Sequence, residues 1–223
     1  VCTYGSQILQ VPLKVNIYLE KYKGIRLMLN TMTNALSANY VNFGVFSLYN
    51  DTALQNALDV CLQICLQIPL SDVMAYVKLS RAYFAFLEVL FHSHLDMLSA
   101  LDSVVFLQLL KTCQEGLQSG ELTVATNCSA AIDHVATYMF LNHARDKPTA
   151  QMIRGHIASN PDILNQLMAT LFNALIFGNQ ANHWAMTRPI LSLLLASEGS
   201  YTEYQAQLIA SQPMENHEKL REE

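Results

Sequence analysis

Apolar residues recur every three or four positions along most of this chain, and polar residues, Gly and Pro separate the runs. In residues 51–68, for example, Leu58, Cys61 and Cys65 fall on one helical face. Pro69 then follows, where a helix has to end. This period belongs to an amphipathic helix, whereas a half-buried strand would alternate at every second residue. The pattern therefore predicts an all-α fold made of many short helices.

The same periodicity places the individual helices. We expect them at residues 22–36, 51–68, 75–92, 102–117, 121–143, 162–177, 183–196 and 203–211. Thr52 and Gln55 have the spacing of a capping box. In the helix at 183–196, Trp184, Leu191 and Leu195 are in register and define the expected packing face. Pro189 is expected near the start of that helix, with Trp184 packed over it.

Helix pairs starting near residues 22, 75, 121 and 162 recur at intervals roughly like the 40 to 47 residues of HEAT and armadillo units. Periodicity alone thus favours an array of antiparallel helical hairpins. Within the helix at 75–92, Leu87 is expected in the core, with Lys78 and Arg81 on the polar face.

Composition excludes several classes of function. Charged residues make up 14% of the chain, below the roughly 25% of typical soluble domains. The net charge is −5 and no basic cluster occurs, so we expect no nucleic-acid partner. No uninterrupted apolar run approaches the 18 or so residues of a membrane span, so we expect no membrane insertion.

The titratable residues do not form a recognisable catalytic or metal site. The five cysteines include no C-x-x-C pair, which favours reduced, buried thiols in the cytosol or nucleus. His92, His94 and Asp96 alternate at the end of a helix instead of following helical spacing, which argues against zinc. Asp133 and His134 adjoin without a nucleophile motif. We expect no catalytic, cofactor-binding or metal-binding residue, no cofactor, and no enzyme activity.

Several blocks of sequence together resemble one protein family. They occupy residues 39–58, 68–72, 78–80, 87–90, 133–138, 184–189 and 211–213, in the order found in the C-terminal region of that family. The first reads NYVNFGVFSLYNDTALQNAL and the sixth WAMTRP. The ordered set resembles the exportin-7 family, also called the Ran-binding-protein-16/17 family, of the importin-β superfamily.

This resemblance implies a right-handed α-α superhelix of HEAT/armadillo-like hairpins. Residues 1–223 would form the C-terminal solenoid segment of a longer receptor, without a separate second domain. The function implied is that of a nuclear export receptor, a karyopherin that binds protein cargo together with Ran-GTP. Phe-Gly nucleoporins would be further partners, and the receptor would shuttle between nucleus and cytoplasm through the nuclear pore complex.

Some alternatives stay open at this point. Members of the resembled family carry a longer, more basic insertion between the helix ending near His143 and the one starting near Gln151. It shrinks here to residues 144–149, which puts its partner contacts in doubt. Exportin-4, a relative with a similar signature, also fits. From other classes, a Ran-independent helical-repeat scaffold or regulatory interaction module would use the same hairpins, and an enzyme or its regulatory subunit would need convergent titratable groups.

The aromatic connector at residues 40–51 carries the predicted partner-binding residues Asn42, Phe43, Tyr49 and Asp51. Tyr and Phe on an ordered loop make strong interface anchors. The competing interpretation is a structural connector in which Phe43 is buried and holds the hairpin together. We favour this buried position for Phe43, because the neighbouring apolar side chains need cover.

Overall fold

The computed structural model describes residues 1–10, 16–37, 44–142, 145, 147–177 and 183–197, and the isolated positions 202, 205, 206, 209 and 210. Within these residues all regular structure is helical and no strand occurs. The predicted all-α class is therefore confirmed. Among the helices of these ranges, none is both long and apolar enough to cross a membrane.

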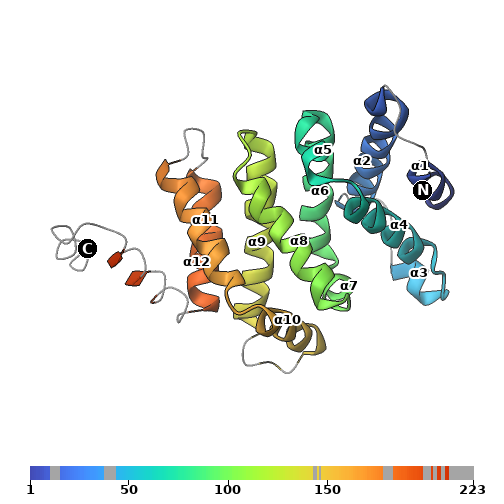
Figure 1. Cartoon of the computed structure of the whole chain (residues 1–223). Helices are drawn as coiled ribbons and strands as arrows, with labels where there is room; N and C mark the ends of the chain where they lie inside the picture. Colours follow the sequence, from blue (N-terminus) through green and yellow to red (C-terminus); the bar gives the residue numbers. More distant parts are fainter. Residues whose placement is uncertain are drawn as a thin grey trace. The chain divides into compact units, whose positions relative to one another are not determined.

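The chain divides into two compact units, of which the first is Val1–His94. Its elements are α1 (Cys2–Leu9), the π-helical turn η1 (Tyr18–Tyr22), α2 (Lys23–Ser37), α3 (Gly44–Leu48), α4 (Ala53–Gln67), α5 (Leu70–Ala75) and α6 (Val77–Ser93). Here α1 packs against α4, and α2 packs against α6 (Figure 1).

The second unit is Leu95–Glu223. Its helices are α7 (Leu95–Ser99), α8 (Ser103–Leu117), α9 (Leu122–Leu141), α10 (Pro148–Ser159), α11 (Ile163–Phe177) and α12 (His183–Ala196). In this unit α8 packs against α9 and α11 against α12. The pairs also meet helix to helix, α8 with α11 and α9 with α12 (Figure 1).

Contacts between α9 and α12 follow a fixed register. The Ser129 hydroxyl donates to the Ala185 carbonyl, 56 residues later, and Thr137 meets Ser192 at a separation of 55. Both partners advance along the chain together, so the two helices are parallel. Parallel stacking of corresponding helices is what successive hairpins of a helical-repeat protein produce.

Contacts that involve the short helices occur at similar separations. Ser103 of α8 contacts His156 of α10 at a separation of 53 residues, and in the first unit the Tyr22 hydroxyl of η1 donates to Asp72 of α5 at a separation of 50. Stacked helical hairpins are present in each unit, because α1 packs on α4 and α2 on α6 in the first, and α8 on α11 and α9 on α12 in the second. The prediction that residues 1–223 form one solenoid concerns the junction of the units and stays a prediction.

The repeat interval is longer than the one expected from the sequence. The helices expected to start near residues 22, 75 and 121 are α2, α6 and α9, and each is the second helix of its hairpin. The helix expected near residue 162 is α11, which is the first helix of its hairpin. The counterpart of α9 is α12. In the second unit, hydrogen bonds between counterparts therefore span 52 to 59 residues, because the short helix α10 lengthens the repeat.

From α2 onward, the observed bounds of each long helix that was predicted agree with the predicted bounds to within two residues. The helix expected at 203–211 lies mostly outside the described residues, although positions 205, 206, 209 and 210 are helical. The capping box at α4 is wrong. Thr52 is the N-cap but makes no side-chain cap bond. Instead the Asp51 carboxylate accepts from the Ala53 N–H at 2.8 Å.

The core of the first unit is built on α6, as its periodicity predicts. Leu87 is fully buried, and Lys78 and Arg81 are exposed. The Tyr83 hydroxyl is buried too and donates to the Cys65 carbonyl at 3.0 Å, which ties α6 to α4. This bond satisfies a polar group that would otherwise cost free energy in an apolar core.

The cysteines are free thiols, as predicted, and all except Cys2 are buried. Burial raises the pKa of Cys61 to about 12 and raises the pKa of Cys65 well above its ordinary value. In the second unit burial also raises the pKa of Cys128, with a further contribution from a hydrogen bond with Cys113. These thiols act as small apolar core residues, since the reactive thiolate form is disfavoured.

Candidate partner-binding surface

Two of the four predicted partner-binding residues, Asn42 and Phe43, lie outside the described residues, so the position of Phe43 stays a prediction. Asp51 is exposed, but its carboxylate holds the first turn of α4 through the Ala53 N–H. Tyr49 is 76% exposed. Of the four predicted residues, Tyr49 is the one whose described environment leaves a large apolar surface free for contact.

The described part of the aromatic connector does not bury its apolar side chains as expected. Val45 and Leu48, on α3, are exposed together with Tyr49. The turn that follows has Asn50 at φ 52°, a left-handed conformation that Asn tolerates better than most residues. The argument that neighbouring apolar residues need cover is therefore wrong for Val45 and Leu48.

A second surface, which the sequence did not reveal, lies along α9 and α12. It begins with Pro189, which stands inside α12 and not near its start as expected. Proline lacks an N–H, so the carbonyl four residues earlier, that of Ala185, loses its helical donor. The buried Ser129 hydroxyl of α9 donates to that carbonyl at 2.5 Å. One helix thereby replaces the hydrogen bond that proline removes from the other.

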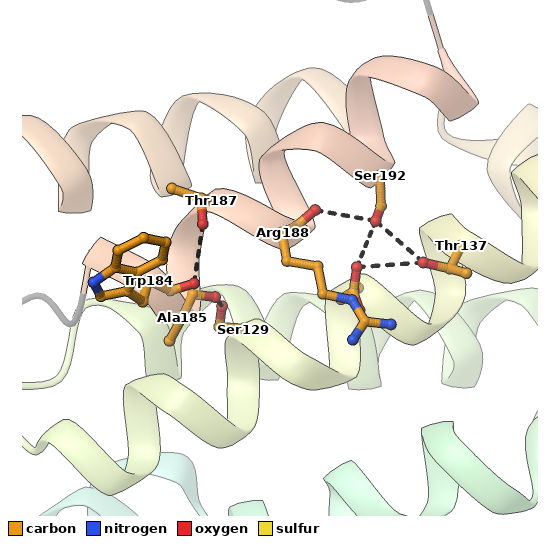
Figure 2. A network of polar contacts seen from close by, with 8 residues as sticks. Ser129, Thr137, Trp184, Ala185, Thr187, Arg188 and Ser192 are labelled. Atoms are coloured by element: carbon orange, nitrogen blue, oxygen red, sulfur yellow. Dashed lines mark hydrogen bonds and ion pairs between the residues drawn. The ribbon is translucent and has the colours of Figure 1, made fainter.

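One turn along, the Asp133 carboxylate of α9 is almost fully buried and binds α12 through both oxygens. Its Oδ1 accepts from the Ser192 hydroxyl at 2.5 Å and from Thr137 at 3.3 Å. Its Oδ2 accepts from Nε of Arg188 at 2.8 Å. Asp133 is thus committed to α12 and is not half of an acid/base pair with His134. Figure 2 shows these contacts along α12.

Arg188 is held at one end and free at the other. Its side chain is 73% exposed although its partner carboxylate is 5% exposed. Among the residues that the structure describes, only Nε has a polar partner, and the terminal amino groups extend away from the network (Figure 2). A guanidinium presents five N–H donors, so those of the terminal amino groups remain available.

The exposed face of α12 carries Trp184, Arg188, Leu191 and Leu195, with Thr187 exposed beside them. The first four positions are four, three and four residues apart, so they lie on one side of the helix. Trp184 is 86% exposed, Leu191 57% and Leu195 47%. The expected packing face of α12 is therefore wrong, as is the expected packing of Trp184 over Pro189.

The packing face of α12 is instead formed by Met186, Ile190 and Leu193, which are buried. Both faces are apolar, and periodicity alone does not distinguish them. One signal in the sequence separates them: the exposed face carries the only charged residue of the helix, Arg188. An arginine is rarely buried without a partner, so it marks the face nearer to water.

A buried histidine in the second unit has a structural role. Nε2 of His156 contacts the Ser99 carbonyl at 2.8 Å, and Nδ1 contacts the Ser103 hydroxyl at 2.8 Å. Its ring stacks on Phe106 at a centroid distance of 4.6 Å. Both nitrogens are therefore occupied in holding α10 against α7 and α8.

This chain is similar in sequence to several curated proteins. It is 36% identical over 231 residues to exportin-7-B of Xenopus laevis, a match that covers 99% of this chain and 21% of that protein. Ran-binding protein 17 of Homo sapiens is also 36% identical, with the same shares of each chain. Ran-binding protein 16 of Drosophila melanogaster is 29% identical over 99% of this chain. The chain thus spans about a fifth of the length of the curated relatives it matches.

No protein-family model matches the chain, and no solved structure matches it. The similarity to the curated relatives extends over both compact units. Along nearly its whole length, the chain is similar in sequence to a C-terminal region of the exportin-7 and Ran-binding protein 16/17 proteins, which confirms the resemblance inferred from its motifs.

Proposed function

We propose that this chain is the C-terminal segment of a nuclear export receptor. The observation that carries the proposal is the 36% identity over 99% of the chain to proteins named exportin-7 and Ran-binding protein 17. The helical hairpins stacked in each unit support it, because repeat arrays offer long surfaces for protein partners. The role proposed is one of binding, not of catalysis.

The receptor that contains this segment would bind protein cargo together with Ran in its GTP form. It would pass the nuclear pore through contacts with Phe-Gly nucleoporins and so shuttle between nucleus and cytoplasm. We further propose that residues 1–223 form one continuous repeat array. The stacking of counterpart helices within both units supports that continuity.

Within the segment, the exposed α12 face is the surface best suited to a protein partner. Trp and Arg are the residue types most enriched among interface hot spots, and here they lie one turn apart. Trp184 and Leu191 together expose apolar surface that burial in an interface would stabilise. The side chains are held on a helix whose position is fixed by Asp133 and Ser129.

The test is a binding assay with the receptor that contains this segment. Purified receptor is mixed with Ran loaded with either a non-hydrolysable GTP analogue or GDP, and retained Ran is measured. Capture of the GTP form in clear preference to the GDP form supports a transport receptor. Equal capture of both forms, or no capture of either, contradicts the proposal and favours a Ran-independent scaffold.

A pair of variants then assigns a role to the α12 face. Trp184→Ala should reduce cargo or Ran capture, whereas Ile176→Ala, which truncates an exposed apolar residue of α11, should not. Both substitutions lie in exposed positions, so both variants should fold. Equal capture by the two variants would place the partner surface elsewhere in the receptor.

A further inference from the structure

The α12 face combines an apolar stripe with one arginine whose orientation is fixed by a buried carboxylate. We propose that this face binds an amphipathic helix of a protein partner that carries a single carboxylate among apolar side chains. The proposal deepens the proposed function and rests on it in one respect, namely that the partner is a protein.

The orientation of Arg188 is fixed before a partner binds. The Nε of Arg188 is held by Asp133, which is itself held by Ser192 and Thr137. The terminal amino groups keep a planar arrangement of donors that matches the two oxygens of a carboxylate. Because the side chain is already oriented, binding loses less conformational entropy than it would with a free arginine.

Charge selects a single carboxylate over a polyanion. Asp133 balances the positive charge of Arg188 at 2.8 Å, so the local site is close to neutral before a ligand binds. The chain as a whole carries −5, which repels a strongly acidic segment. A phosphate group, with up to two negative charges, meets the same repulsion. A single carboxylate can accept from the terminal N–H donors of Arg188 with less electrostatic repulsion than a phosphate group or a strongly acidic segment would meet.

Spacing selects a helix as the partner element. The stripe runs from Trp184 to Leu195 with intervals of four, three and four residues, the pattern of a helix–helix seam. At 1.5 Å per residue this extends about 16 Å, the length of about three helical turns. An antiparallel or parallel helix can place apolar residues against Trp184, Leu191 and Leu195 and one carboxylate against Arg188.

A second copy of this chain that paired through its own α12 would not supply a carboxylate to Arg188. A symmetric pair would bring α12 against α12. The helix reads HWAMTRPILSLLLA and contains no Asp or Glu, so two copies would oppose Arg188 with Arg188 or with apolar residues. Self-pairing of this face therefore leaves the terminal donors of Arg188 unsatisfied, which is costly in an interface.

The test is a selection with a defined peptide library and the 223-residue chain. The peptides share a helical Ala/Gln scaffold, and four positions on one face vary among Leu, Phe, Glu, Gln and Lys. The expected result is enrichment of peptides with one Glu and two or three Leu or Phe. For a selected peptide, replacing that Glu by Gln should weaken binding about tenfold, the change that 1.4 kcal/mol produces.

Binding can be followed directly, because Trp184 is the only tryptophan of the chain. Its emission should be that of a water-exposed indole and should shift to shorter wavelength on addition of the selected peptide. No shift at a saturating concentration would overturn the assignment to this face. A shift caused by raising the chain concentration alone, without peptide, would overturn the proposal in favour of self-association.

Variants at Arg188, Asp133 and Ile176 test which side chains recognise the Glu of the selected peptide. Arg188→Gln should abolish the preference for Glu over Gln, because it removes the positive charge. Arg188→Lys should weaken the preference, because an ammonium keeps the charge but not the planar pair of donors, and Ile176→Ala should keep it. Asp133→Asn, a change in a positioning residue, leaves the charge of Arg188 without its partner, so peptides with two Glu should no longer be disfavoured relative to peptides with one. If Arg188→Gln retained the Glu preference, or the library enriched apolar residues without Glu, the proposal would be wrong. These measurements contain no Ran, so their outcome is independent of the Ran capture assay.

Discussion

The hydrogen bond between Ser129 and the Ala185 carbonyl compensates for one missing N–H at Pro189. An unsatisfied buried carbonyl costs on the order of 1 to 3 kcal/mol, so the contribution of Ser129 depends on the proline. The Ser129 side chain of α9 and the α12 backbone around Pro189 therefore contribute to stability together. Neither residue has an evident role when the sequence around it is considered alone.

Ser129→Ala should therefore lower the free energy of unfolding by about 1 to 3 kcal/mol. The loss should be smaller in a Pro189→Ala background, where residue 189 regains an N–H for the Ala185 carbonyl. Urea denaturation of the two single variants and the double variant gives the coupling, expected at roughly 0.5 kcal/mol or more. Equal losses from Ser129→Ala in both backgrounds would show that the proline and the serine act independently.

At the scale of the element, the stability of each unit depends on helices buried along one face. Helix α6 is the clearest case, because its period and its observed burial agree. Leu87→Ala should lower the free energy of unfolding by about 2 to 5 kcal/mol, since it leaves a cavity among buried neighbours. Lys78→Ala, on the exposed side of the same helix, should change it by about 0.5 kcal/mol or less.

The two variants are compared by the urea concentration at which half of the protein is unfolded. The comparison is valid when the unfolding free energy of both variants depends on urea concentration with the same slope. A midpoint for Lys78→Ala that falls as far as that for Leu87→Ala would mean that the two faces of α6 are not distinguished by burial.

The elements themselves could be predicted because their determinants are local. Apolar period and proline position define where a helix such as α4 ends, and Pro69 follows its C-cap residue Ile68. The exposed face of α12 could not be predicted in the same way, because exposure depends on which other helices pack against it. Trp184 and Met186 are both apolar, yet Met186 is buried and Trp184 is exposed.

The candidate site was harder to predict, since its residues are far apart in the sequence. Asp133 and Arg188 belong to different motif blocks, and nothing local indicates that they form an ion pair. The predicted Thr52 capping box shows that residue type and spacing alone do not ensure a bond. Thr52 makes no side-chain cap bond, and the neighbouring Asp51 carboxylate accepts from the Ala53 N–H instead.

At the scale of the whole molecule, buried weak acids occur in both units. Burial raises the pKa of Tyr22, Cys61 and Cys65 in the first unit and of Cys128 in the second. For Tyr22 the hydrogen bond to Asp72 contributes further in the same direction. Each of these groups stays protonated in the folded chain at a pH where the unfolded chain would release the proton.

The chain should therefore lose stability in alkaline solution. Below about pH 8.5 these thiols are protonated in both states and have no effect on the pH dependence. Above that pH the folded state binds more protons than the unfolded state, so stability falls as pH rises toward the Cys61 pKa of about 12. Each group contributes a slope of at most about 1.4 kcal/mol per pH unit.

Urea unfolding under reducing conditions at several pH values between 7.5 and 10.5 measures this effect. Cys61→Ala removes one titrating group and should make the decline less steep than in the unmodified chain. A free energy of unfolding that stays constant over this range would contradict the burial of these thiols.

The nearly constant separation between stacked helices also affects how the chain can fold during synthesis. Hydrogen bonds between counterpart helices of the second unit span 52 to 59 residues, so each helix needs only about that much further chain before its counterpart is made. At the usual elongation rate of about 5 to 20 residues per second, a helix meets its counterpart within roughly 3 to 12 seconds of its own synthesis. The apolar surface of each new hairpin is thus exposed on the ribosome for a short and similar time along the chain.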